Sequence, residues 1–212
     1  MKKNRQLILV ATLTLCMLLT LFVPATNVNA ASKRTKALTA YQKKLKKLDS
    51  GAYKFALVYL DNDSVPELLI TPSTSVHVAA GEVYTYTGGK LKQLKYAGSD
   101  FGRFVYSKKK SVVSNCAWIN GYGSVATFYR FNKKGKGIKL KKFEEANLPT
   151  KTVYKINGKK VSKKKYNSEY KKMIKKYPLK QIWPYNTFNL TTQNINNLTK
   201  NYKSFILTGD KF

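Results

Sequence analysis

From Tyr53 onward the chain alternates short runs of strand-forming residues with turn signals, and this pattern restricts the fold more than any other feature. The strongest turn signal is Asn157-Gly158, a dipeptide that favours a two-residue hairpin turn between Val153–Ile156 and Val161. Short strands joined by close turns pair with their neighbours in sequence, so the pattern predicts an antiparallel meander. The predicted strands are residues 55–60, 68–70, 83–86, 91–94, 104–106, 112–113, 125–131, 138–140 and 153–156.

Helical spacing occurs on both sides of this strand-rich region. Leu38, Tyr41, Leu45 and Leu48 recur every three or four residues, which predicts an amphipathic helix that Gly51 ends. A second helix is predicted after Ser162, a suitable N-cap, with a short third helix after Thr191. One face of the second helix is apolar, through Tyr166, Tyr170, Met173, Ile174 and Tyr177. The expected fold class is therefore α+β: an antiparallel β meander flanked by amphipathic helices at both ends.

The first thirty residues have the order of a secretory signal. Met1–Arg5 is positively charged, Leu7–Val23 is apolar, and Val28-Asn29-Ala30 supplies small residues for a peptidase. We expect a signal peptide at 1–30, cleavage after Ala30, and a single α+β domain at 31–212 that is secreted or held at the cell surface. The alternative is a retained anchor, because Leu7–Val23 as a helix would span about 26 Å of a hydrocarbon core of about 30 Å.

Positive charge is the second strong feature. The chain has 40 Lys and Arg against 10 Asp and Glu, and removal of the signal would lower the net charge from +30 to +27. Only Arg34, Arg103 and Arg130 are arginines outside the signal. Because lysine acts as a point charge and arginine forks read base edges, the composition predicts diffuse attraction to polyanions and no sequence-specific nucleic-acid binding.

These charges predict anionic cell-envelope polymers or glycans as partners, with peripheral contact to an anionic membrane as a further outcome. Residues 133–176 hold seventeen lysines against three glutamates, so this segment is the expected polyanion face. A solvated basic surface without a dedicated ligand explains the same composition. No pattern in the chain indicates an oligomeric state.

The acidic residues gather at one place. Asp61, Asp63 and Glu67 fall within seven positions, in a loop between two predicted strands. Short oxygen-bearing side chains at alternate positions, followed by a carboxylate, are what a Ca²⁺ ion requires. The same residues are also explained without an ion, as a turn in which Asp and Asn side chains accept hydrogen bonds from backbone amides.

The segment Leu60-Asp61-Asn62-Asp63-Ser64-Val65-Pro66-Glu67-Leu68-Leu69-Ile70 resembles a motif of uncharacterised secreted proteins of Gram-positive bacteria. It is similar to degenerate calcium loops of FG-GAP and VCBS repeats. The resemblance implies a weak, structural Ca²⁺ site with Asp61, Asp63 and Glu67 as ligands, and it implies no activity. Two positions depart from the motif, since Tyr59 replaces its first aspartate and Ser64 replaces its glycine.

Catalytic signals are absent from the sequence. His77 is the only histidine, Cys116 is the only cysteine after the signal, and no nucleophile motif, phosphate loop or dinucleotide fingerprint surrounds them. We therefore predict no catalytic residue and no cofactor other than Ca²⁺. The residues favour a non-catalytic, envelope-associated binding protein over two alternatives: a secreted hydrolase acting on cell wall or glycan, and a cationic membrane-active effector.

Four large aromatic residues lie beside predicted turns: Trp118, Tyr122, Trp183 and Tyr185. Large aromatic side chains usually fill a core, and that is the first interpretation of all four. Exposure of two or more of these rings beside lysines would instead favour a face that binds glycans.

Overall fold

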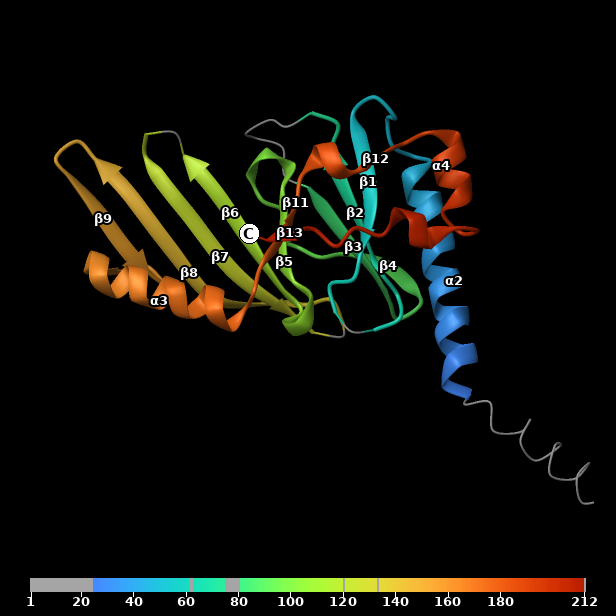
Figure 1. The fold of residues 1–212 in the computed structure, drawn as a ribbon, viewed down its shortest axis with the longest axis horizontal. Coiled ribbons are helices and arrows are strands. Elements are labelled where there is room, and N and C mark those ends of the chain that lie inside the picture. Colours follow the sequence, from blue (N-terminus) through green and yellow to red (C-terminus); the bar gives the residue numbers. More distant parts are fainter. Residues whose placement is uncertain (1–24, 62, 75–80, 120, 133, 212) are drawn as a thin grey trace, which may run out of the picture.

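The computed structural model describes residues 25–61, 63–74, 81–119, 121–132 and 134–211, and places them in two antiparallel sheets (Figure 1). Sheet 1 has five strands in the order β12-β1-β2-β3-β4, and sheet 2 has eight in the order β10-β9-β8-β7-β6-β5-β11-β13. The strands of sheet 1 are β1 (Tyr53–Val58), β2 (Glu67–Pro72), β3 (Glu82–Thr87), β4 (Lys90–Gln93) and β12 (Phe188–Asn189). The strands of sheet 2 are β5 (Phe104–Ser107), β6 (Val112–Ile119), β7 (Gly123–Phe131), β8 (Gly137–Leu148), β9 (Lys151–Ile156), β10 (Lys159–Val161), β11 (Lys180–Ile182) and β13 (Asp210–Lys211).

The expected α+β meander flanked by helices at both ends is wrong. Most predicted strands exist, but the chain leaves sheet 1 after β4 and starts a second sheet at β5. The reason is visible in burial: Phe55–Val58 and Phe104–Ser107 are buried at every position. A sheet with one open face would alternate buried and exposed residues, whereas strands covered on both faces are buried continuously. The fold is therefore mostly β, with two sheets packed face to face.

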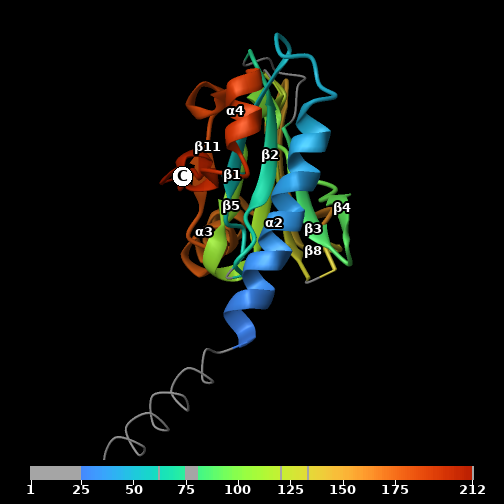
Figure 2. The same cartoon turned by 90° about the vertical axis from the view of Figure 1, so that its right-hand side faces the viewer.

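The helices form outer layers. They are α2 (Ala25–Leu45), α3 (Lys163–Lys176) and α4 (Thr192–Asn197), with 3₁₀ turns η1 (Asp100–Gly102), η2 (Lys108–Lys110), η3 (Pro184–Asn186) and η4 (Tyr202–Phe205). Helices α2 and α4 cover the outer face of sheet 1, and α3 covers the outer face of sheet 2 (Figures 1 and 2). The Ser162 and Thr191 hydroxyls accept hydrogen bonds from the third residue after each, as N-caps.

Helix α2 spans Ala25–Leu45 of the described residues, so the predicted cleavage point at Ala30 lies inside it. It ends before Gly51, the residue expected to end it. Residues 1–24 of the predicted signal lie outside the described part of the chain. The signal and its cleavage stay predictions. None of the described helices combines the length and hydropathy needed to span a membrane.

Three hydrophobic clusters hold the layers together. The first packs Leu38, Tyr41 and Leu45 of α2 against the outer face of sheet 1. The second joins the sheets through Val58 and Leu69 on one side and Phe104 and Val113 on the other, and the third packs α3 against Phe128 and Phe143 of sheet 2. Alternate residues of β1 and β5 belong to different clusters, so each of these strands packs against a neighbouring layer on both of its faces.

The C-terminal segment completes both sheets, which the sequence pattern did not indicate. Strand β12 pairs with β1, placing Phe188 opposite Phe55, and β11 pairs with β5 in the other sheet. The Leu207 amide then donates to the Leu57 carbonyl at 2.8 Å, and the Tyr106 hydroxyl donates to the Thr208 carbonyl at 2.8 Å. The last part of the chain therefore ties the two sheets together.

Strands β6–β9 extend beyond the area of sheet 1 (Figure 1). Strand β8 is the longest strand of this extension with 12 residues, where the pattern had indicated a strand only at 138–140. Helix α3 crosses one face of these strands, so this part of sheet 2 is where strands, helix and solvent meet.

Candidate functional site

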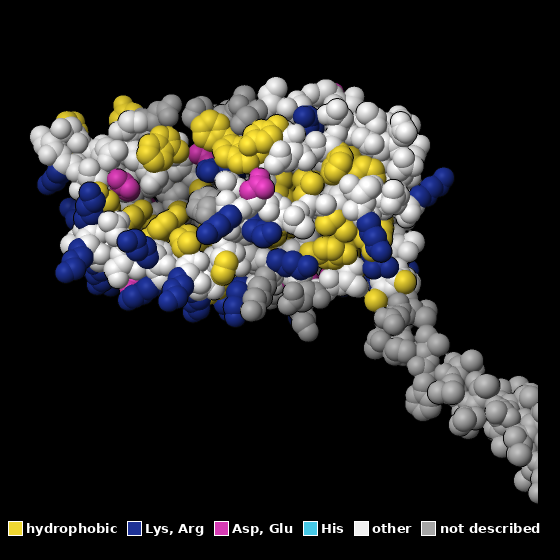
Figure 3. All heavy atoms as spheres, in the orientation of Figure 1, with side chains coloured by type: hydrophobic (Ala, Val, Ile, Leu, Met, Phe, Trp, Pro, Cys, Tyr) yellow, Lys and Arg dark blue, Asp and Glu magenta, His cyan; other side chains and the backbone are white. Residues whose placement is uncertain are grey.

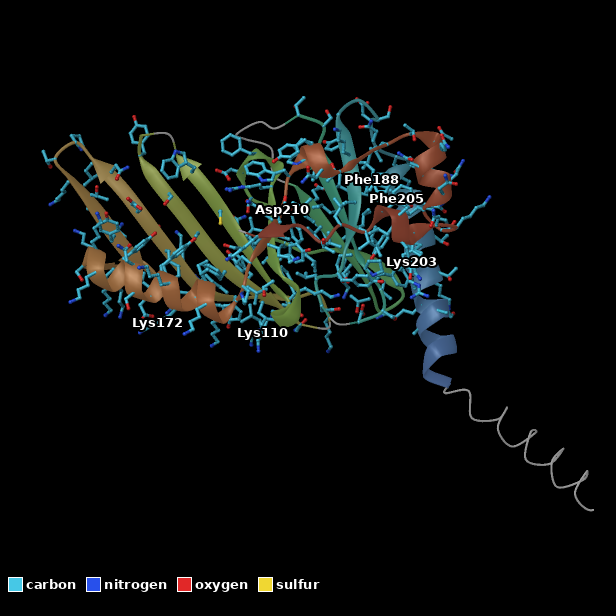
Figure 4. The ribbon with its side chains drawn as sticks, viewed as in Figure 1. Lys110, Lys172, Phe188, Lys203, Phe205 and Asp210 are labelled. Atoms are coloured by element: carbon cyan, nitrogen blue, oxygen red, sulfur yellow. The ribbon has the colours of Figure 1, made fainter. Side chains whose placement is uncertain are left out.

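Lysines cover the solvent side of α3. Tyr166 and Met173 are buried against sheet 2, whereas the seven lysines of the helix are all exposed. We call this set the lysine face, and it comprises Lys163, Lys164, Lys165, Lys171, Lys172, Lys175 and Lys176. In Figure 3, Lys and Arg side chains line the edge of the molecule along which α3 runs. Figure 4 places Lys172 and Lys110 along the same edge.

The lysine face is largely uncompensated. Among the described residues only Lys172 of this set forms an ion pair, at 2.9 Å from Glu169, which also pairs with Lys141 of β8. These two hydrogen bonds lower the pKa of Glu169 to about 2, so the carboxylate stays charged. The other six ammonium groups have no carboxylate partner in the described part of the chain.

The first turn of α3 and the spacing of its lysines oppose the charge preferences of a helix, although Lys175 and Lys176 in the last turn suit the dipole. Lys163, Lys164 and Lys165 occupy the first turn of α3, which has no acidic residue, although the helix dipole favours negative charge there. Lys171 and Lys175 are four residues apart, as are Lys172 and Lys176, and each like-charge pair of this kind costs about 0.2–0.5 kcal/mol. A bound anion would reduce both the unfavourable interaction of lysines with the helix dipole and the repulsion between neighbouring lysines. The helix is therefore electrostatically suited to a polyanion.

The Asp61–Glu67 loop is built by its own side chains. The Asp63 amide donates to Asp61 Oδ1 at 2.8 Å, and the Val65 amide donates to Asp63 Oδ1 at 2.7 Å. Asp63 Oδ2 accepts a hydrogen bond from Lys33 Nζ of α2 at 2.9 Å. The two amide hydrogen bonds are the turns of the ion-free interpretation, in which Asp side chains accept from backbone amides.

Glu67 is the buried member of the acidic group. Its Oε2 accepts from the Leu60 amide at 2.9 Å and its Oε1 accepts from the Thr85 hydroxyl at 3.2 Å, so the carboxyl closes the loop across β1, β2 and β3. Burial, reinforced by the charges of Asp61 and Asp63, raises the pKa of Glu67 to about 8. Burial likewise raises the pKa of Asp61.

The three predicted calcium ligands thus share one loop but face different partners. Among the described residues, no group of three His, Cys, Asp or Glu side chains is placed to hold a metal ion. Asp61, Asp63 and Glu67 do line a common cavity of about 580 Å³, together with Lys33. Calcium binding stays a prediction, and an ion would compete with hydrogen bonds that the loop already makes.

Of His77 and Cys116, the residues on which thiol chemistry would depend, the structure describes only Cys116. Cys116 is buried on β6, 3.2 Å from the Ser114 hydroxyl, and burial raises the pKa of its thiol. A thiol that keeps its proton is a small apolar filler rather than a nucleophile.

Three of the four aromatic residues weighed from the sequence are exposed. Trp118 is 57% exposed, Tyr122 72% and Tyr185 68%, so the interpretation that all four fill the core is wrong. Trp183 is half-buried and stacks on Tyr185, with ring centroids 5.9 Å apart. Hydrophobic side chains accordingly gather on the same face as the lysines in Figure 3, next to η3.

A buried ion pair supports this aromatic group. Asp100 Oδ2 accepts the Trp118 amide at 2.6 Å, and Asp100 Oδ1 accepts from the Arg103 guanidinium at 3.0 Å. The guanidinium lies 5.0 Å from the centroid of the Trp183 ring. Sequence reasoning singled out the rings but missed Asp100 and Arg103, whose only signal is their i,i+3 spacing before a strand.

Comparison with known proteins assigns no family. No family model matches the chain, and no curated protein matches it. A solved structure described as "Structure of a Xanthomonas Type IV Secretion System related protein" is similar with a TM-score of 0.39 and 14% identity, over 51% of this chain and 58% of that one. The chain therefore spans little more than half the length of that protein, and a similarity of this extent supports no conclusion about function.

Proposed function

We propose that this protein is an exported, non-catalytic binding protein that attaches to anionic polymers of the cell envelope through the lysine face of α3. The observation that carries the proposal is the set of six exposed ammonium groups on one helix without a carboxylate partner among the described residues. Attachment through lysines is diffuse and salt-sensitive, because each ammonium acts as a point charge that displaces counterions.

The arrangement of the lysines supports a linear ligand. Lys164, Lys171 and Lys175 form one row along α3, and Lys165 and Lys176 belong to a second row beside it. The helix rises about 1.5 Å per residue, so each row is roughly 17 Å long. Tyr166, Tyr170 and Met173 fix the opposite side of the helix on sheet 2, so the two rows keep a constant orientation. A polymer with anionic groups along its length would contact several lysines at once.

Co-sedimentation with purified cell walls tests the proposal, using walls with and without their anionic polymers. We expect binding to intact walls at 50 mM NaCl, loss of binding at 500 mM, and no binding to stripped walls. Walls that bind equally well after stripping would contradict the proposal.

Matched variants assign the binding to α3. The α3 set replaces five lysines by glutamine, at positions 164, 165, 171, 175 and 176. The control set removes the same charge elsewhere, from exposed lysines of the α2 side, at positions 36, 43, 47, 90 and 95. We expect the α3 set to weaken wall binding about 10-fold or more and the control set to weaken it several-fold less. Equal effects would mean that net charge alone determines attachment.

A further inference from the structure

We propose that the cleft between Trp118 and α3 binds an uncharged hexopyranose unit of a glycan. This is a second binding site, separate in chemistry from the lysine face. The cleft has a volume of about 280 Å³ and is lined by Arg103, Trp118, Ser124, Glu145, Tyr166 and Tyr170, among others. This volume is at the lower end of small-ligand sites, which suits one sugar ring.

The floor of the cleft exists because three neighbouring side chains are small. Cys116 lies opposite Ala126, and Ser124 lies opposite Trp118, on the face of β6 and β7 that α3 partly covers. Further along the same face, Phe128 and Phe143 fill the space between sheet and helix. Gly123, with φ of +123°, allows the start of β7 to approach β8 where a side chain would collide with the Glu145 backbone.

Hydrogen bonds and ring contacts order the surroundings of the cleft. The Trp118 backbone is tied to Asp100, Asp100 is tied to Arg103, and Arg103 lies over Trp183. Across the cleft, Tyr166 and Tyr170 are parallel within 2°, with centroids 6.3 Å apart. Trp118 is 57% exposed on an anchored stretch of backbone and offers a flat apolar surface, which is what stacking on the C–H face of a sugar requires.

Polar groups with unused capacity complete the site. The Glu145 side chain makes no hydrogen bond with any described residue, and Arg103 Nε is buried without an acceptor among them. The Tyr170 hydroxyl can donate a hydrogen bond, and burial raises its pKa to about 12. A carboxylate acceptor and hydroxyl donors beside an aromatic surface match the alternating hydroxyl groups of a pyranose.

The charges in the cleft select an uncharged ligand. The Arg103 guanidinium is already neutralised by Asp100, and Glu145 adds a negative charge. An acidic sugar would meet that carboxylate without a free cation in the lining. The cleft therefore recognises hydroxyl groups and ring faces, whereas the lysine face recognises negative charge.

Calorimetric titration with three uncharged hexasaccharides tests the proposal: β-1,4-linked glucose, β-1,4-linked N-acetylglucosamine and α-1,4-linked glucose. A ligand of about a dozen non-hydrogen atoms held at ordinary efficiency binds in the low-millimolar range, and contacts beyond one ring improve this. We expect at least one hexamer to bind with a dissociation constant of about 1 mM or lower, unchanged between 50 and 500 mM NaCl. Failure of all three to bind, or loss of binding in salt, would overturn the proposal.

Substitutions place the binding in the cleft. Trp118→Ala should weaken the affinity about 10-fold or more, and Trp118→Phe should restore part of it, since a ring is kept. Tyr96→Ala is the matched control, because Tyr96 is 59% exposed and lies outside the cleft, stacked on Tyr129. An unchanged affinity in Trp118→Ala would overturn the proposal.

A second variant guards against a folding effect. Glu145→Gln keeps the size of the side chain and removes its charge, so weakened hexamer binding with an unchanged thermal midpoint would identify Glu145 as a sugar-binding group. Unchanged affinity in both Glu145→Gln and Trp118→Phe would count against the cleft. Both variants should keep the salt-sensitive attachment to walls, while the α3 set should keep hexamer binding, so the two proposals fail independently.

Discussion

Two acidic regions of this molecule use their polar groups in opposite ways. In the Asp61–Glu67 loop, carboxylate oxygens accept hydrogen bonds from the Leu60, Asp63 and Val65 amides. In the Trp118 cleft, Glu145 makes no side-chain hydrogen bond with a described residue and Trp118 is 57% exposed. The polar groups of the loop are hydrogen-bonded within the fold, whereas the Glu145 side chain in the cleft has no hydrogen-bond partner among the described residues. Satisfied groups of this kind stabilise, whereas open groups on a rigid scaffold are available to a ligand.

The largest expected effect tests whether the scaffold of the cleft is as well packed as sheet 1. Phe143 is fully buried beneath α3, in edge contact with Tyr166 and Tyr170. Phe143→Ala should lower the free energy of unfolding by about 3–5 kcal/mol, measured in urea. Phe55→Ala, at a fully buried ring of sheet 1, should cause a similar loss. A loss below about 1 kcal/mol at Phe143 alone would show that the cleft rests on a loose support.

The next effect uses the protonation of Glu67. Its pKa is about 8 in the fold and about 4.5 in the unfolded chain, so the folded state binds the extra proton between these values. Stability from this group is present at pH 5 and is lost as the pH rises towards 8, by about 3 kcal/mol. Asp61 and Tyr41 share its environment, and burial raises the pKa of each of them as well.

Urea unfolding at pH 5 and pH 8 measures this loss. Glu67→Gln, which keeps the size and cannot ionise, should remove most of the pH dependence. Glu145→Gln is the control from the other region and should leave the pH dependence in place. A wild-type protein that is equally stable at both pH values would contradict the burial of Glu67.

Titration with Ca²⁺ tests whether the carboxylates of the Asp61–Glu67 loop can still bind an ion. If Asp61, Asp63 and Glu67 bind Ca²⁺ with the weak affinity typical of extracellular sites, 10 mM CaCl₂ should add about 1–3 kcal/mol to the free energy of unfolding. The combined change Asp61→Asn and Asp63→Asn should abolish that gain. No shift of the thermal midpoint with Ca²⁺ would leave the loop as a turn held by its own hydrogen bonds.

The smallest effect separates stability from attachment. The α3 set should change the free energy of unfolding by less than about 1 kcal/mol, because exposed lysines without partners contribute little to the fold. Thermal unfolding in parallel with wall binding measures both properties. A large loss of stability in this variant would mean that the lysine face is part of the structure rather than a binding surface.

Turns, helix caps and most strands were predictable from the sequence. The division of the strands between two packed sheets was not. Asn157 and Gly158 both adopt positive φ, as the predicted hairpin turn requires, and Ser162 caps α3. Strands β11, β12 and β13 are two or three residues long, so no periodicity marks them. They are defined only by their pairing, β12 with β1, β11 with β5 and β13 with β11. The uninterrupted apolar run Phe55–Val58 was the available sequence signal for a strand covered on both faces.

For the candidate sites too, the sequence predicted some features and not others. Composition identified the lysine-rich segment that contains α3, because charge can be counted without a fold. The acidic loop was identified by spacing, but the burial of Glu67 depends on Thr85, which is 18 residues away in sequence. The exposure of Trp118 depends on where α3 stops covering β6, a property of packing between distant segments that no local pattern records.

The pairing of the C-terminal segment with both sheets has a consequence for synthesis. Neither β1 nor β5 acquires all its neighbours until residues beyond Lys180 are free to fold back, as in any topology rich in long-range contacts. During synthesis both sheets would thus remain incomplete until the C-terminal segment has emerged from the ribosome. Under the proposed export, this delay would keep the chain unfolded while it passes through a translocation pore.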